Sequence, residues 1–206
     1  MFTGIVTDMG KILKMQTVGD SIKFTVKPTI KNYLKNVKKG SSIAINGACM
    51  TITDKRGNTF EFTTVNESLK KTNLGDLKIG SYVNLEKPMQ INATIDGHIV
   101  QGHVDTTGYV EKIIKLKDSW EYYFTFSSAF KDNIIYVGSI AINGVSLTIA
   151  QIVKETKKDI LIKIAIIPHT WKVTNFRYMK PGDRVNIEFD MLGKFVKRII
   201  ENLRVK

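Results

Sequence analysis

A chain of 206 residues, 43% of them hydrophobic, can bury a sizeable core as one large domain or as two small ones. Its single cysteine, Cys49, excludes an internal disulfide, and three histidines without cysteine partners make a poor zinc set. No stretch approaches the roughly 20 apolar residues of a membrane span, and the opening MFTGIVTDMG lacks the features of a secretion signal, so we expect a cytoplasmic protein without a metal.

The net charge of +12 could attract a polyanion such as nucleic acid. The lysines, however, are scattered through expected turns and solvent faces, and the chain lacks an RNA-binding aromatic motif. We therefore expect no nucleic-acid partner and no membrane. The alternative is a basic barrel that stacks RNA bases on exposed aromatic residues, for which Trp120, Tyr122 and Tyr123 are the candidates.

Short apolar runs rich in Ile, Val, Thr and Phe, separated by Gly, Asn and Asp, predict strands along the chain. In the first half these runs are 22–26, 42–45, 50–53, 59–63 and 82–85. Short helices are expected at 29–36 and 128–134. With about six strands in under 100 residues, and no helix long enough for a parallel crossover, the pattern favours a small closed antiparallel barrel.

The chain also repeats itself. The block GSSIAINGACMTI at 40–52 matches GSIAINGVSLTI at 138–149, and the offset from Asn46 to Asn143 is 97. Residues 67–73 match 169–175 and residues 80–86 match 182–188, both at an offset of 102, while the openings from Gly4 and Gly102 agree at an offset of 98. Four ordered matches predict two homologous domains, at 1–96 and 97–189, followed by a tail at 190–206.

That tail carries apolar residues at helical spacing. Leu192, Phe195, Val196, Ile199, Ile200 and Leu203 form one stripe, with Lys and Arg opposite. The spacing predicts an amphipathic helix. It fits two arrangements, namely packing on the chain's own barrel or a helix bundle between subunits.

Several blocks together resemble the riboflavin synthase family along nearly the whole chain. They are MFTGIV at 1–6, NGACMT at 46–51, GHIVQGHVD at 97–105, NGVSLT at 143–148, IPHT at 167–170 and GDRVNIE at 182–188. The resemblance implies an all-β fold of two tandem six-stranded antiparallel Greek-key barrels, each with a lumazine site, and a C-terminal helix that joins three chains.

The activity that the resemblance implies is a dismutation of two 6,7-dimethyl-8-ribityllumazine molecules. One gives a four-carbon unit to the other, which yields riboflavin and 5-amino-6-ribitylamino-2,4-pyrimidinedione without a cofactor. The resemblance also implies a homotrimer whose active sites lie between subunits, and a possible association with lumazine synthase.

Candidate catalytic residues follow from the repeat and from the resemblance. His103 is the first candidate for proton transfer, because imidazole titrates near neutral pH, and its repeat partner Ile5 suggests a role of the C-terminal barrel alone. Cys49 and Ser146 occupy equivalent positions, as do Thr51 and Thr148. The resemblance makes Cys49, Ser146 and Thr148 site residues, whereas a buried cysteine could instead be a small hydrophobe.

Asp190, just before the tail helix, fits both a helix N-cap and a catalytic partner. The resemblance also predicts the residues that contact substrate. In the first barrel we expect Gly4, Ile5, Val6, Cys49, Met50, Thr51, Thr63, Thr64, Val65, Asn66, Glu67 and Ser68. In the second we expect Gly102, His103, Val104, Ser146, Leu147, Thr148, Ala165, Ile166, Ile167, Pro168, His169 and Thr170.

One position departs from the family pattern. Many members have a lysine directly before the glycine that corresponds to Gly138, where this chain has Val137. That ligand contact is absent here or comes from elsewhere, for example from Lys131. The chief alternative function is a non-enzymatic lumazine or flavin carrier of the same fold, like the bacterial antenna proteins. The presence of His103, Ser146, Thr148 and His169 favours the enzyme.

Overall fold

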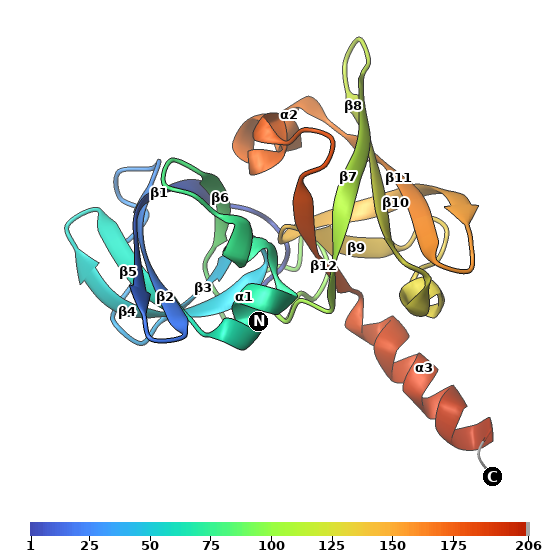
Figure 1. The fold of residues 1–206 in the computed structure, drawn as a ribbon, viewed down its shortest axis with the longest axis horizontal. Coiled ribbons are helices and arrows are strands. Elements are labelled where there is room, and N and C mark those ends of the chain that lie inside the picture. Colours follow the sequence, from blue (N-terminus) through green and yellow to red (C-terminus); the bar gives the residue numbers. More distant parts are fainter. Residues whose placement is uncertain (205–206) are drawn as a thin grey trace.

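The computed structural model describes residues 1–204 and contains two closed antiparallel barrels side by side, followed by a C-terminal helix (Figure 1). The first barrel contains β1 (Asp8–Val18), β2 (Ser21–Pro28), β3 (Ser42–Ile45), β4 (Ala48–Arg56), β5 (Thr59–Thr64) and β6 (Tyr82–Glu86). The second contains β7 (Thr106–Lys115), β8 (Trp120–Ser127), β9 (Ser139–Ile142), β10 (Val145–Glu155), β11 (Asp159–Ile166) and β12 (Arg184–Phe189). The predicted fold class is confirmed.

The two barrels have the same topology. Around the first, the strands neighbour one another in the order β1-β2-β5-β4-β3-β6, and around the second, read from β7, in the order β7-β8-β11-β10-β9-β12. Most strands alternate inward apolar with outward residues, whereas β3, β6, β9 and β12 are buried along nearly their whole length, and each barrel encloses its own core. In the first, Phe24 and Phe62 stack at 4.9 Å, and in the second, Tyr122 meets Phe176 edge to face at 5.1 Å.

Short helices connect the strands. They are α1 (Asn66–Lys71) with η1 (Asn73–Asp76), η2 (Ser128–Asn133), and α2 (Pro168–Val173) with η3 (Asn175–Tyr178). The helix expected at 128–134 is therefore a 3₁₀ helix, and the one expected at 29–36 was wrong. That segment forms turns, because the Asp8 carboxylate accepts hydrogen bonds from the Thr29 hydroxyl and the Ile30 N–H and fixes a bend at its start.

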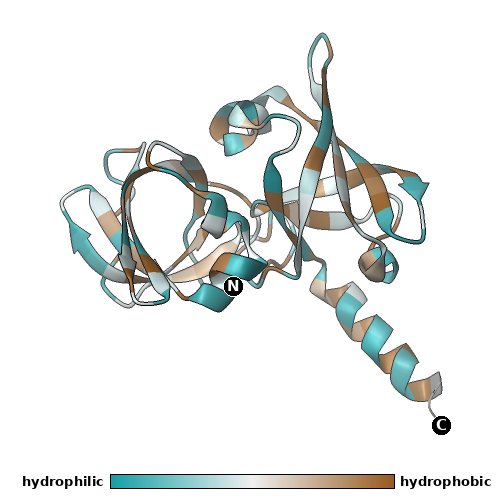
Figure 2. Cartoon of the chain, in the orientation of Figure 1, coloured by the Kyte–Doolittle hydropathy of each residue, from teal (hydrophilic) through white to brown (hydrophobic). Residues whose placement is uncertain are grey.

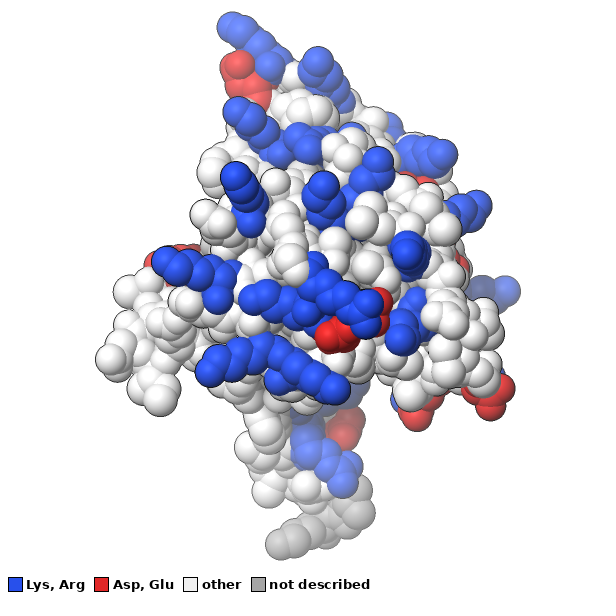
Figure 3. All heavy atoms as spheres, turned by 90° about the vertical axis from the view of Figure 1, so that its left-hand side faces the viewer, with Lys and Arg blue, Asp and Glu red and all other residues white. Residues whose placement is uncertain are grey.

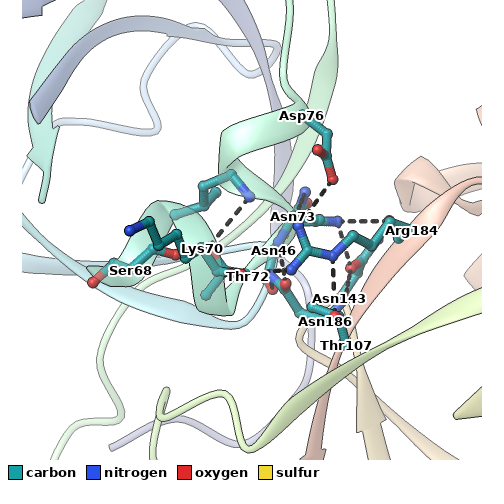
Figure 4. Close-up of polar contacts among 11 residues, drawn as sticks. Asn46, Ser68, Lys70, Thr72, Asn73, Asp76, Thr107, Asn143, Arg184 and Asn186 are labelled. Carbon is teal, nitrogen blue, oxygen red and sulfur yellow. Dashed lines mark hydrogen bonds and ion pairs between the residues drawn. The ribbon is translucent and has the colours of Figure 1, made fainter. Parts of the chain in front are cut away.

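A network of buried asparagines joins the barrels, and Figure 4 shows its part around Asn46, Asn73, Asn143 and Asn186. The Asn186 amide donates to the Asn46 carbonyl at 2.8 Å, and the Asn84 amide donates to the Asn143 carbonyl at 2.9 Å. Asn73 and Asn175 make the next pair, since their N–H groups donate to Asn186 and Asn84 at 2.6 and 2.7 Å. Buried amides with matched partners fix the relative orientation of the barrels.

Backbone contact tightens the same interface. A Cβ atom on Gly47 would lie 2.7 Å from the Gly144 nitrogen, and one on Gly144 would lie 2.6 Å from the Gly47 nitrogen. Both glycines also have positive φ angles, of 78° and 75°. Only glycine fits both the conformation and the close approach.

Helix α3 (Met191–Arg204) projects away from both barrels, and its apolar residues form a stripe along it (Figures 1 and 2). Leu192, Phe195 and Leu203 are 66%, 60% and 68% exposed. The helix is tied to the second barrel by polar contacts, with Lys194 Nζ 2.9 Å from Asp105 and Lys197 Nζ 3.5 Å from Asp132. The first of the two predicted arrangements, packing of the stripe on its own barrel, was therefore wrong.

Basic side chains are spread over the outer face of the first barrel, where they outnumber acidic ones (Figure 3). Some are paired, such as Lys23 with Glu61 at 3.4 Å, while Lys11 and Lys27 stand directly opposite on β1 and β2. No helix within residues 1–204 is long and apolar enough to cross a membrane.

Candidate active site

Each barrel presents one candidate half-site, built from equivalent elements. In the first, β4 carries Cys49 to Thr51, and the end of β5 leads into α1. In the second, β10 carries Ser146 to Thr148, and the end of β11 leads into α2. A third element, the segment that precedes the first strand of a barrel, completes each half-site.

These leading segments are exchanged between the barrels. The Ser146 N–H donates to the Gly4 carbonyl at 2.7 Å, and the Cys49 N–H donates to the Gly102 carbonyl at 2.8 Å. A Cβ atom on Gly4 would lie 2.6 Å from that of Ser146, and one on Gly102 would lie 2.7 Å from that of Cys49. Phe2 also pairs with Val100 between the two segments.

This exchange corrects the expected assignment of six residues. Gly4, Ile5 and Val6 belong beside the second barrel, where Val6 packs on the core, and not in the first. Gly102 and Val104 lie beside the first barrel, where Val104 packs on the core. His103, between them, is therefore on the Cys49 half-site, so its expected place beside the C-terminal barrel was wrong, while its role in proton transfer stays a prediction.

Two buried glutamates anchor the exchanged segments. Glu86 on β6 accepts from the N–H groups of Thr3 at 2.7 Å and Gly4 at 3.1 Å. Glu188 on β12 accepts from Gln101 at 2.6 Å and from Gly102 and His103 at 3.0 Å each. Burial raises the pKa of both carboxyls, while the backbone N–H groups oppose that rise. Each segment is thus held by its own barrel and reaches over to the other.

Most of the predicted contact residues lie at the surface. The exposed ones are Ile5, Thr51, Thr63, Val65, Asn66, Glu67, His103, Thr148, Ala165, Ile167, Pro168 and His169. Val6, Cys49, Met50, Ser68, Val104, Ser146, Leu147 and Thr170 are partly exposed. Thr64 and Ile166 are 1% and 0% exposed, so neither residue offers a surface to a ligand on the isolated chain. Both half-sites are open on the isolated chain.

Ser146 has a partner that the sequence reasoning missed. The His98 Nδ1 lies 2.7 Å from the Ser146 Oγ, and His98 is only 8% exposed. Burial lowers the pKa of His98, and this outweighs the opposite effect of the nearby Asp190 carboxylate. A neutral imidazole can accept the serine proton, which is how serine hydroxyls are activated. His98 and His103 lie in the same sequence block, GHIVQGHVD at 97–105. Only the proximity of His98 to Ser146 in the structure distinguishes the two histidines.

Asp190 does cap helix α3, as one of the two interpretations predicted. Its Oδ1 accepts from the Leu192 N–H at 3.0 Å. The same carboxylate acts electrostatically on His98, so capping and proximity to the Ser146 half-site occur together.

The aromatic residues named as candidates for stacking RNA bases are engaged in packing. Trp120 stacks on Trp171 of α2 at 4.5 Å, Tyr122 is buried and donates to the Phe176 carbonyl at 2.8 Å, and Tyr123 donates to Glu121 at 3.0 Å. These three residues therefore belong to the core of the second barrel and to the packing of α2, and they do not form a base-stacking face.

Comparisons with known proteins decide the family. The lumazine binding domain model matches residues 3–88 and again 101–190. A riboflavin synthase of Actinobacillus pleuropneumoniae is 39% identical over 97% of this chain and 90% of its own. Those of Bacillus subtilis and Escherichia coli are 38% and 33% identical, over 97% and 98% of this chain and 90% and 93% of their own. The chain belongs to the riboflavin synthase family.

Solved structures of a protein called LumP have a similar fold. LumP complexed with 6,7-dimethyl-8-(1'-D-ribityl) lumazine is 26% identical, with a TM-score of 0.81 over 92% of this chain and 99% of its own. LumP complexed with riboflavin is 25% identical, with a TM-score of 0.79 over the same shares.

Val137, where the family resemblance led us to expect a lysine, has an unusual backbone conformation. Val137 is 59% exposed and has a φ angle of 60°, which a β-branched residue rarely adopts. Its N–H donates to the Ile149 carbonyl at 3.1 Å, so the strained turn lies next to the strand of Ser146 and Thr148. Strain of this kind persists where the surroundings impose it.

His98 gives a pH-dependent prediction. Because folding lowers its pKa, the folded state binds fewer protons, and the free energy of unfolding should fall as pH decreases through the unfolded pKa of about 6.5. In His98→Gln this part of the pH dependence should disappear. Urea unfolding of both proteins between about pH 8 and pH 5 measures it, with His169→Gln as the exposed control. Equal slopes in wild type and His98→Gln would refute the assignment.

Proposed function

We propose that this chain is a riboflavin synthase that converts two molecules of 6,7-dimethyl-8-ribityllumazine into riboflavin and 5-amino-6-ribitylamino-2,4-pyrimidinedione. The atoms of two lumazines equal those of the two products, so the transfer of four carbons needs no external oxidant, reductant or cofactor. The observation that carries the proposal is the pair of equivalent, open half-sites within a chain of this family. Two similar half-sites suit a reaction that consumes two identical molecules.

The main chemical task of the protein in this reaction is to transfer protons. The lumazine ring is electron-poor, so the protons of its C7 methyl group are acidic and a bound donor can lose one to give a stabilised anion. His103, on the Cys49 half-site, is the candidate for this transfer. Ser146 with His98, on the other half-site, is the candidate for activating a hydroxyl or a water toward the second ring. The remaining task is to hold two rings face to face.

The assembly that this requires is a homotrimer, in which the N-terminal barrel of one subunit faces the C-terminal barrel of another. Two features support it, namely the open half-sites and the exposed stripe on α3. Long exposed apolar faces are unstable in water and favour a helix bundle. We place this reaction in the cytoplasm, and a further association with lumazine synthase is compatible with it.

The direct test is anaerobic incubation of the purified protein with 6,7-dimethyl-8-ribityllumazine alone. Riboflavin is followed by absorbance and the pyrimidinedione by chromatography. Equimolar products support the proposal. Tight binding without turnover would instead indicate a carrier, which the similarity to LumP and the presence of Val137 make the second candidate.

A charge placed in the α3 stripe should dissociate the assembly. Ile199→Glu would put a carboxylate into the bundle core, where desolvation of an unpaired charge costs several kcal/mol. We expect light scattering to show a fall from trimer to monomer and the rate of turnover to fall with it. Arg198→Gln, on the opposite face of the same turn, is the control. A monomer with full activity would rule out sites between subunits.

A further inference from the structure

Helix α3 is physically connected to the segment that carries His103. Lys194 on its first turns binds both oxygens of Asp105, at 3.0 and 2.9 Å. Asp105 lies two residues after His103, and its carboxylate also accepts from the Phe189 N–H at 2.8 Å. The contact is partly shielded from water, since the two side chains are 26% and 21% exposed. Such a pair is less screened than one at the surface.

Glu188 extends this connection to His103 itself. It is 3% exposed, follows Ile187 on β12, and accepts from the N–H groups of Gln101, Gly102 and His103. The charged groups near it are Lys194 from α3 and Asp105 from the leading segment, while on β9 it faces Ala141. Lys194 therefore acts on both carboxylates that hold the segment.

The first barrel has no such link. The position equivalent to Asp105 is Thr7, whose hydroxyl donates to the Leu85 carbonyl, and the chain there continues from β6 without a helix. Within residues 1–204, only the segment with His103 is connected to the element that bears the apolar stripe. Because the first barrel has the same topology without this contact, the contact between Lys194 and Asp105 is not required for barrel packing.

We propose that Lys194 is a positioning residue for the reaction, which couples the placement of α3 to the placement of His103 through Asp105 and Glu188. Association of α3 with copies of itself then orders the leading segment on the Cys49 half-site of the same chain. The inference rests on the proposed function. It adds a role for α3 beyond holding chains together.

The test compares two lysines of the same helix. Lys194→Met should lower kcat by about tenfold or more, with KM within about twofold, because small displacements of a catalytic group are costly. Lys194→Arg should restore much of the loss. Lys197→Met removes the same charge one turn later, where the partner is Asp132 of η2, and should change kcat less than about twofold.

Two further measurements separate positioning from a general structural effect. Because Lys194 lowers the pKa of Glu188, Lys194→Met should move the acid limb of the rate profile to higher pH, which Lys197→Met should not do. The amide resonances of Gly102 and His103 should shift in Lys194→Met only. These resonances need no substrate, so they test the link even if the wild type fails to convert lumazine, which would count against the proposed function alone.

If Lys194→Met no longer forms the trimer, Asp105→Asn becomes the variant that tests the coupling between α3 and His103. This variant keeps an acceptor for the Phe189 N–H and leaves α3 unaltered. A similar loss of kcat in an intact assembly, not additive with Lys194→Met, supports the coupling. An unchanged kcat in Asp105→Asn, or equal effects of Lys194→Met and Lys197→Met, overturns it.

Discussion

Replacement of His103 by alanine is expected to lower kcat by about 10²- to 10⁴-fold, which is the usual contribution of a general acid or base. The fold should remain intact, because His103 is exposed and its structural contact is the backbone N–H that donates to Glu188. Lumazine binding should also change little, since the surrounding Cys49 half-site keeps its other groups. Steady-state kinetics, thermal unfolding and equilibrium binding measure the three quantities.

The shape of the loss distinguishes chemistry from binding. Removal of a group that acts only in the transition state lowers kcat and kcat/KM equally. Added imidazole should restore part of the rate in His103→Ala, and His103→Gln, which fills the same space without a titratable ring, should remain slow. Wild-type turnover in His103→Ala would remove this residue from the mechanism.

The sequence predicted the barrels well because their signal is local and repeated. Short apolar runs between Gly, Asn and Asp placed residues 42–45 where β3 lies and 59–63 where β5 runs. Asn46 and Asn143, matched at an offset of 97, have the same φ angle of 46°. Residues 29–36 were expected to form a helix, but hydrogen bonds to the Asp8 carboxylate fix turns there instead. Because Asp8 lies in another part of the chain, the local sequence pattern does not show these bonds. The short α1 and α2 lie below the length at which periodicity is readable.

The site was harder to predict, because a repeat gives correspondence between positions but not which barrel each position contacts. Gly4 and Gly102 match perfectly whether their segments stay with their own barrel or cross to the other. The repeat also does not indicate that His98 lies beside Ser146. The two residues are 48 positions apart in the chain, yet His98 Nδ1 lies 2.7 Å from Ser146 Oγ. Only tertiary packing contains that information.

Mixed trimers of two inactive variants should regain activity if the exchange of segments and the sites between subunits are both correct. His103→Ala damages the Cys49 half-site, and Ser146→Ala damages the other half-site. In a mixed trimer, some junctions pair the intact Cys49 half-site of a Ser146→Ala chain with the intact second half-site of a His103→Ala chain. Random mixing of equal amounts makes about a quarter of all junctions intact, and each mixed trimer has one intact junction among its three, so isolated mixed trimers should show about a third of wild-type turnover.

The control uses two variants of the same half-site. His103→Ala and Cys49→Ala both damage the half-site of the first barrel, so mixing them should restore nothing. The assignment suggested by sequence order, with His103 beside Ser146, predicts the reverse outcome for both mixtures. Co-expression with two different affinity tags isolates the mixed trimers, and their turnover decides. Restoration in the second mixture but not in the first would refute the exchange, and restoration in neither would place the active site within one chain.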